Sequence, residues 1–179
     1  KFNEKEFNNK VPEEFRLKTK GIEVGHIFYF GDKYSKPMNC SVDSKDGKKI
    51  FVKMGSYGIG VSRLVAAIIE AKFSNEKMKW PREVSPFDVV IIPVINKNDN
   101  SNVQKAKILY KSLIEKGIDV LFDDIDENIS NKFKKHDLIG IPYQIIVGSK
   151  TTKDKFEFKE VGKETQVLEI NKIINLLKK

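Results

Sequence analysis

The sharpest chemical feature of the sequence is the segment of residues 54–63, MGSYGIGVSR, which ends a strand pattern and opens a helical one. Glycines let a ligand approach the backbone closely, and the first turn of a helix offers unpaired N–H groups to an anion. Arg63 in that turn opposes the helix dipole by roughly 0.3–1 kcal/mol unless an anion shares the site. The segment matches neither G-x-G-x-x-G nor a P-loop. The alternative is an ordinary strand-to-helix turn, with glycines at positive φ and a solvated arginine.

A second candidate is the segment of residues 21–28, GIEVGHIF, where a glutamate and a histidine interrupt an apolar strand pattern. Strand alternation places Glu23 on one face and His26 on the other. The Glu23 carboxylate could bridge to a nucleotide-bound metal ion, and the His26 ring could contact a phosphate or a base. The alternative is a solvated glutamate and a histidine whose polar atoms are satisfied within the strand.

A third candidate is the segment of residues 123–135, DDIDENISNKFKK, where carboxylates follow a predicted strand and lysines follow the carboxylates. Ligands of α/β sheets gather at such strand ends. Carboxylates such as Asp123 can read the N–H edge of guanine, lysines such as Lys132 can contact phosphates, and aromatic rings can stack on unpaired bases. The alternative is a polar loop followed by a solvated helix face. Phe133 continues the apolar stripe of that helix, so we expect it in the core.

The first half of the chain must position the first two candidates. Residues 23–34 are rich in aromatic and β-branched residues and predict a strand. Residues 38–42 and 49–54 flank Asp46-Gly47, which predicts a hairpin with a two-residue turn. A helix with one apolar face follows Gly60. A single good helix makes a thin core, so we expect this half to be part of a larger domain or to pack on a partner.

The second half alternates strands and helices, after a polar segment with two prolines at residues 75–86 that predicts a linker. Its strands are predicted at residues 87–95, 118–122, 143–147, 156–161 and 165–168. Its helices are predicted to begin near residues 101, 129 and 170, the first with Ser101 as its cap. This order predicts a mixed sheet with helices on its faces.

Composition narrows the classes of protein that fit. The 179 residues are 40% hydrophobic and 32% charged, as in a globular rather than a disordered chain. No apolar run approaches the roughly 18–20 residues of a membrane helix, and the polar first residues give no secretory signal, so we expect no membrane partner. One cysteine, Cys40, and two histidines exclude a disulfide framework and a Cys/His zinc cluster. The net charge of +8 permits a nucleic-acid partner without requiring one.

Four blocks of the sequence together resemble prolyl-tRNA synthetases of the bacterial type, which are class II aminoacyl-tRNA synthetases. The blocks are GIEVGHIFYFGDKYS, MGSYGIGVSRLVAAIIE, WPREVSPFDV and KHDLIGIPYQIIVG, and the resemblance runs from about residue 20 to the C-terminus. It implies an α/β (α+β) fold in which residues 1–80 form the C-terminal part of a class II catalytic domain, an antiparallel sheet with the motif 3 helix. Residues 81–179 would form a mixed-sheet α/β anticodon-binding domain.

The resemblance also implies an activity. The parent enzyme would activate proline with ATP and Mg²⁺ to prolyl-adenylate and transfer the prolyl group to tRNA(Pro). Arg63 would be the motif 3 arginine, a catalytic residue that grips ATP. Glu23 and His26 would lie beside ATP, with Glu23 near the ATP-bound Mg²⁺. Ser56 would line both the ATP site and the proline pocket, and the other residues of the proline pocket would be Phe28, Gly58 and Gly60.

Two departures from the family pattern concern the substrate sites. Many bacterial members have cysteine where this chain has Ser56, so thiol chemistry is absent at that position. The family loop after the paired aspartates commonly carries arginine and a Pro-Gly pair, whereas this chain has Ile125 and Ile129-Ser130. Asp123 and Lys132 remain the residues that we expect to contact tRNA.

Motifs 1 and 2 and an editing domain have no counterpart in these residues. We therefore expect the chain to be the C-terminal portion of a longer synthetase and to be inactive alone. We expect the full-length parent to be a homodimer in the cytoplasm, or in an organelle if a targeting segment precedes these residues. The alternatives are a non-catalytic synthetase-like module that binds tRNA or a partner protein, and an unrelated nucleotide-binding α/β protein.

Overall fold

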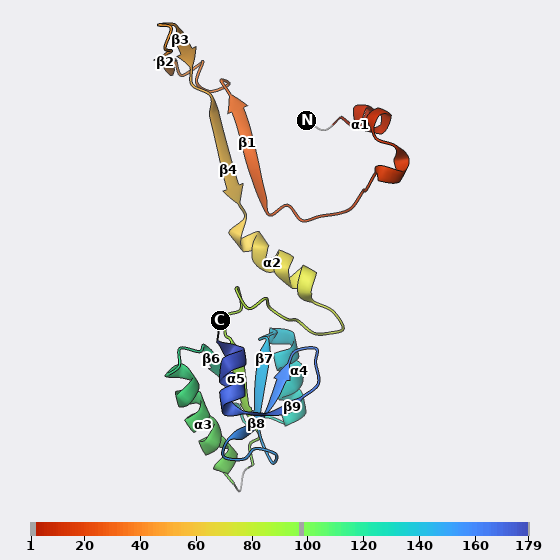
Figure 1. The fold of residues 1–179 in the computed structure, drawn as a ribbon, viewed down its shortest axis with the longest axis vertical. Coiled ribbons are helices and arrows are strands. Elements are labelled where there is room, and N and C mark those ends of the chain that lie inside the picture. Colours follow the sequence, from red (N-terminus) through yellow and green to blue (C-terminus); the bar gives the residue numbers. More distant parts are fainter. Residues whose placement is uncertain (1–2, 97–98, 179) are drawn as a thin grey trace. The chain divides into compact units, whose positions relative to one another are not determined.

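The structure, a computed structural model, describes residues 3–96 and 99–178, which belong to two compact units (Figure 1). The first unit extends to Ala67 and the second begins at Ile68. The described strands form two sheets of two strands and one sheet of five strands, and helices accompany them. This mixed content of helices and strands confirms the expected fold class.

The first unit is built around a long antiparallel pair of strands. Its elements, in chain order, are α1 (Glu4–Lys10), a 3-10 turn (Glu13–Phe15), β1 (Gly25–Gly31), β2 (Ser41–Asp43), β3 (Lys49–Phe51), β4 (Met54–Ile59) and the start of α2 (Val61–Lys72). β1 pairs with β4, and β2 pairs with β3 in the expected hairpin. The strand expected over residues 23–34 is therefore shorter at both ends.

The glycine-rich segment is a strand rather than the predicted tight turn. β4 pairs with β1 over its length, and the helix α2 begins after the single residue Gly60. None of Gly55, Gly58 and Gly60 has a positive φ, so the interpretation of these glycines as left-handed turn residues is wrong. Extended backbone continues to the helix start because the ladder with β1 supplies hydrogen-bond partners up to that point.

The two-residue turn predicted at Asp46-Gly47 is also wrong in length. The last paired residues of the hairpin are Asp43 and Lys49, so residues 44–48 connect them. The N–H of Ser44 donates to the Lys48 carbonyl oxygen at 2.8 Å, which closes the loop from inside. Gly47 adopts φ +72°, so the glycine does supply the left-handed residue that the turn needs.

The expected thin core of the first unit is confirmed. Ser35 is the only buried residue among residues 3–67. Large apolar side chains on both strands of the central pair are exposed, including Ile27 at 82% and Tyr57 at 84%. Exposed apolar side chains in such number are typical of a surface that takes part in further interactions.

The second unit is a five-stranded sheet with helices on both faces (Figure 1). After the end of α2, its elements are β5 (Val89–Pro93), α3 (Ser101–Ile114), β6 (Val120–Phe122), α4 (Ile129–Ile139), β7 (Tyr143–Val147), β8 (Lys155–Glu160), β9 (Gln166–Glu169) and α5 (Ile170–Leu177). The strand order is β6-β5-β7-β8-β9, with β6, β5 and β7 parallel and the last two pairings antiparallel. The predicted mixed sheet is confirmed.

The central strand β5 is buried on both faces, as its uninterrupted apolar run predicts. Val89 and Ile91 face the larger core cluster, which also contains residues of α3 and α5. Val90 and Ile92 face the smaller cluster, against which α4 packs through residues such as Phe133. Phe133, which we expected in the core, is half-buried at the edge of this smaller cluster.

Helix α3 begins at Ser101, but Ser101 is its first helical residue rather than its cap. Asn100 occupies the cap position without a side-chain hydrogen bond. The Asp99 carboxylate instead accepts from the Ser101 N–H at 2.8 Å and from the Ser101 hydroxyl at 2.9 Å. Among the described helices, none is long and apolar enough to cross a membrane.

The predicted linker is fixed to the second unit. Met78 is only 3% exposed, and its N–H donates to the Asp137 carbonyl oxygen at 2.8 Å. The Trp80 N–H donates to Gly140, and the Trp80 indole N–H donates to Ile139, both on carbonyl oxygens at 2.9 Å. This segment thus packs on the C-terminal end of α4. The two compact units meet in the sequence after Ala67, whereas the predicted boundary between the domains lies between residues 80 and 81.

Candidate functional site

Four of the predicted site residues lie on one face of the β1–β4 pair. His26 is opposite Gly58, and Phe28 is opposite Ser56. Directly opposed residues of an antiparallel pair share a face of the sheet. The rings of His26 and Phe28 lie with their centroids 4.4 Å apart. Beside them Gly58 leaves open space, since a Cβ at that position would meet no atom within 4 Å.

Arg63 reaches the start of β1 from the first turn of α2. Its Nη1 donates to the Glu23 carbonyl oxygen at 2.7 Å and lies 4.0 Å from Oε1 of the Glu23 carboxylate. The other carboxylate oxygen, Oε2, lies 3.8 Å from Nδ1 of His26. The prediction that Glu23 and His26 occupy opposite faces is wrong, because Glu23 precedes β1 and is not part of its ladder.

The junction between β4 and α2 determines where Arg63 lies. The Gly60 N–H donates to the Val24 carbonyl oxygen at 3.0 Å, and the Gly60 carbonyl oxygen accepts from Leu64 at 3.0 Å. A Cβ on Gly60 would lie 3.2 Å from the Cβ of Arg63, which is a tight contact. Gly60 thus lets the Arg63 side chain run close over the junction toward Glu23.

These residues present mixed charge on an open surface. The side chains of Arg63, Glu23 and His26 are 57%, 64% and 51% exposed. An exposed guanidinium beside the first turn of a helix can bind an anion through charge-assisted hydrogen bonds. Across residues 3–96 and 99–178, no group of three or more His, Cys, Asp or Glu side chains could hold a metal ion. The surface therefore fits Mg²⁺ only with nucleotide phosphates as further ligands.

The third candidate segment forms a buried cluster in the second unit. Asp123 directly follows β6, and Lys132, Lys135 and His136 of α4 share one helix face by their spacing of three and four residues. The Asp123 carboxylate lies 2.6 Å from His136 Nε2, 3.1 Å from Lys135 Nζ and 3.4 Å from Lys132 Nζ. Lys132 Nζ also donates to the Asp123 carbonyl oxygen at 3.1 Å. The Ile125 N–H donates to the carboxylate at 3.2 Å, which ties the loop to the cluster.

The charges of this cluster depend on one another. Burial raises the pKa of the Asp123 carboxyl, but the hydrogen bond with His136 and the nearby ammonium groups of Lys135 and Lys132 outweigh burial and lower the pKa to about 2. Asp123 is therefore ionised at neutral pH, so Nε2 of His136 must carry the proton in their hydrogen bond. Burial also lowers the pKa of His136, despite the attraction of Asp123. Its Nδ1 is buried and has no hydrogen-bond partner among the described residues.

The cluster is internal, which changes the interpretation of the two residues that we expected to contact tRNA. Asp123 is 5% exposed and Lys132 is 1% exposed, so neither side chain offers an accessible surface. The exposed residues of the loop are their neighbours, among them Asp124 and Ile125. Residue types alone predict that Asp123 and Lys132 are exposed, because lysine and aspartate are rarely buried. Reasoning from sequence also missed His136 as the partner of Asp123, although its helical spacing from Lys132 was a usable signal.

Comparison with known proteins identifies the family. Residues 88–179 match the family described as "Anticodon binding domain", and this match spans more than half of the chain. The chain therefore belongs to the anticodon-binding domain family. The matched region contains the five-stranded sheet and the Asp123 cluster.

The relatives named "Proline--tRNA ligase" confirm the resemblance found in the four sequence blocks. The protein of that name from Pelagibacter ubique (strain HTCC1062) is 59% identical over 179 residues, which is 99% of this chain and 40% of the relative. The one from Bradyrhizobium sp. (strain BTAi1 / ATCC BAA-1182) is 51% identical over 146 residues, or 81% of this chain and 32% of the relative. The chain thus spans less than half the length of these relatives.

A solved structure supports the fold. The structure described as "Giardia lamblia Prolyl-tRNA synthetase in complex with prolyl-adenylate" superposes with a TM-score of 0.68 and 23% sequence identity. The match covers 84% of this chain and 32% of the Giardia chain. At this identity the likeness concerns the fold.

Proposed function

We propose that this chain is part of a proline-specific aminoacyl-tRNA synthetase, which activates proline with ATP to prolyl-adenylate and transfers the prolyl group to tRNA(Pro). The observation that carries the proposal is the 59% identity to a proline–tRNA ligase over 99% of the chain, because it includes both units. The proposal assigns residues 1–80 to the catalytic domain and residues 81–179 to the anticodon-binding domain. It includes a cytoplasmic, homodimeric parent enzyme.

In this proposal the surface of the first unit contributes to the site for ATP and proline. Arg63 provides a fixed positive charge toward ATP phosphates, since its guanidinium is anchored on the Glu23 carbonyl oxygen. Preorganised charges of this kind stabilise the negative charge that develops during phosphoryl or acyl transfer. His26 and Ser56 lie within the same surface and can donate hydrogen bonds to ATP.

The proline pocket is proposed along the same strand pair. Phe28, Ser56 and Gly58 line its floor, with Gly60 at the helix junction. The absent side chain at Gly58 leaves space on this floor for a small ring. Glu23 is the proposed protein contact of Mg²⁺, which would neutralise phosphate charge when it is bound with ATP.

The second unit is proposed to bind tRNA through the loop that follows β6. Asp123 and Lys132 act in this proposal as positioning residues: they are buried and hold the loop by contacts to its backbone. The exposed Asp124 carboxylate is the group of this loop that can accept hydrogen bonds from the N–H edge of a base. Ile125 is 55% exposed at the loop surface and offers an apolar contact in place of the arginine common in the family.

The direct test is proline-dependent ATP–pyrophosphate exchange by the full-length parent with and without the substitution Arg63→Ala. We expect exchange to fall by at least about 10²-fold, as the loss of one preorganised charge does. The matched control is Arg16→Ala, because Arg16 lies in the same unit and donates to backbone carbonyl oxygens of its own segment. Near-normal exchange in Arg63→Ala would show that Arg63 is not part of the ATP site. A wild-type parent without exchange would instead favour the non-catalytic module.

A further inference from the structure

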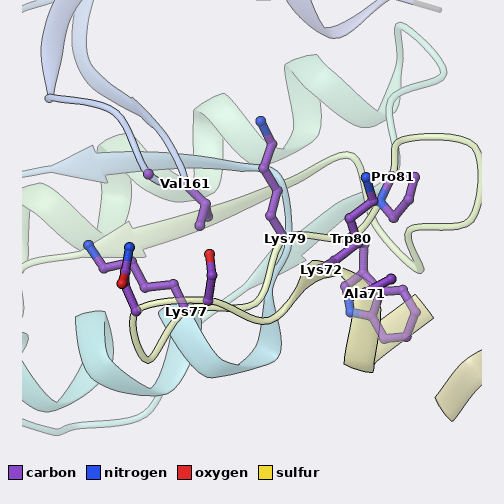
Figure 2. Close-up of a pocket in the computed structure, with 10 residues that line it drawn as sticks. Ala71, Lys72, Lys77, Lys79, Trp80, Pro81 and Val161 are labelled. Carbon is purple, nitrogen blue, oxygen red and sulfur yellow. The ribbon is translucent and has the colours of Figure 1, made fainter. Parts of the chain in front are cut away.

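A basic cleft of about 610 Å³ lies in the second unit, away from the Asp123 cluster. Figure 2 shows Lys72, Lys77 and Lys79 around it, with Trp80 and Val161. Ser74 and Gly162 also line the cleft. Its volume is in the range of ligand sites in proteins.

The lining of the cleft carries positive charge only. Of the described residues that line it, three are lysines and none is aspartate or glutamate. Carboxylates outside the lining compensate two of the lysines: Glu160 lies 2.5 Å from Lys79 Nζ, and Asp137 lies 3.7 Å from Lys77 Nζ. Lys72 makes no ion pair with the part of the chain that the structure describes. The cleft therefore presents an excess of positive charge to an anion, chiefly that of Lys72.

The walls of the cleft are fixed by the backbone. On one side, Ser74 and Lys77 exchange N–H···O hydrogen bonds of 2.9 and 3.0 Å across a tight turn. On another side, the Trp80 indole N–H is fixed on the Ile139 carbonyl oxygen at 2.9 Å. Lys77 and Lys79 thus project from anchored segments, so binding of a ligand to them would not carry the cost of ordering a loop.

The position of the cleft separates it from the loop proposed to read the anticodon. Glu160, the partner of Lys79, pairs with Tyr143, which is the first residue of β7. Asp123 follows the last residue of β6. Since β6, β5 and β7 are parallel, the cleft lies at the amino ends of these strands and the loop lies at their carboxyl ends.

We propose that the basic cleft binds the phosphate backbone of the same tRNA, as a sequence-independent contact additional to the loop of residues 124–128. The inference rests on the proposed tRNA partner. Flexible lysines suit phosphates as point charges, and contacts to phosphate add affinity without base specificity. A polyanion is favoured over a small anion because the side chains of Lys77 and Lys79 point in different directions (Figure 2), which suits separate phosphate groups.

The test measures tRNA affinity of the 179-residue chain as a function of salt concentration. The double substitution Lys72→Gln with Lys77→Gln removes two charges and leaves the Lys79 ion pair in place. The control is Lys105→Gln with Lys107→Gln, an equal change of charge on exposed residues of α3. We expect roughly tenfold weaker binding at low salt and a salt slope smaller by about one to two, from two lost phosphate contacts. Trp80 fluorescence verifies that each variant is folded.

The outcomes separate this inference from the proposed function. The loss must be equal for tRNA(Pro) and for the same tRNA with a substituted anticodon, because the contact is with phosphate. A loss no larger than in the Lys105/Lys107 control, or one that depends on the anticodon, would overturn the cleft as a backbone site. If the wild-type chain binds no tRNA, the proposed tRNA partner fails and the cleft inference fails with it.

Discussion

The substitution Asp123→Asn tests whether the buried cluster stabilises the second unit. It keeps the size of the side chain but removes the charge that faces Lys132 and Lys135 at 3.4 and 3.1 Å. The carboxyl pKa falls from its ordinary 3.8 to about 2, and at 1.36 kcal/mol per pH unit this shift corresponds to about 2 kcal/mol at neutral pH. Loss of one partner from a buried ion pair costs about 3–5 kcal/mol in proteins. We therefore expect the free energy of unfolding to fall by roughly 2–4 kcal/mol.

The pH dependence gives the prediction a second, independent check. The folded pKa of Asp123 is lowered, so its contribution is fully present above pH 4 and is lost as the pH falls toward about 2. The difference between wild type and Asp123→Asn should therefore be large at pH 7 and nearly vanish near pH 2. Burial lowers the pKa of His136, which adds an acid-side loss of stability below about pH 6.5 in the wild type. For this reason the variant is compared with wild type at each pH.

The assay is urea unfolding followed by the fluorescence of Trp80, the single tryptophan, whose indole is bonded to the end of α4. Asp124→Asn is the control, because Asp124 is the exposed neighbour and should change stability by less than about 0.5 kcal/mol. A change for Asp123→Asn as small as that of the control at pH 7 would refute the reasoning. A loss that is the same at pH 7 and pH 2 would refute the electrostatic cause.

Two further predictions concern backbone positions of the same unit. Gly140→Ala should lower the free energy of unfolding by about 3 kcal/mol in urea unfolding, because φ is +82° and the new Cβ would lie 2.6 Å from Met78 Cγ. Gly162→Ala is the control, because Gly162 has φ +84° but its new Cβ would have no atom within 4 Å. An equal loss of unfolding free energy in both variants would contradict the role of Met78. Glu76→Gly should raise the melting temperature and increase the free energy of unfolding by roughly 0.5 kcal/mol. The reason is that Glu76 has φ +59°, a backbone conformation that glycine adopts without strain. The control is Glu83→Gly, because Glu83 is exposed and lacks a positive φ, and this substitution should lower the melting temperature. If both substitutions change the melting temperature in the same direction, residue 76 carries no backbone strain.

Much of the second unit could be predicted from the order of apolar residues. The uninterrupted run at β5 predicts a strand buried on both faces, and the structure places its alternate residues in two separate core clusters. Gly140 and Gly162 end their elements at positive φ, as their positions in the pattern suggest. Local patterns suffice here because each helix and strand buries its apolar face within the same unit.

The first unit was less predictable because its local signals compete. Glycines in residues 55–60 favour a turn, yet pairing with β1 extends them into a strand. Glu23 continues a strand pattern in sequence, yet it lies outside the ladder and meets Arg63, a residue 40 positions later. Whether such a segment forms a strand depends on the strand with which it pairs. When that strand is distant in sequence, the local residue pattern does not reveal it.

The order of elements in the second unit, the grouping of the motif residues and the family that they indicate all follow from the amino-acid sequence. Which charged groups are accessible depends on how the helices and strands pack. Asp123 and Lys132 belong to a segment typical of a solvated loop and helix face, and His136 directly follows it, but the packing of α4 on the end of β6 buries all three. The reason is physical: burial of a charge depends on a compensating group within a few ångströms, and that distance is set by how helix and sheet pack.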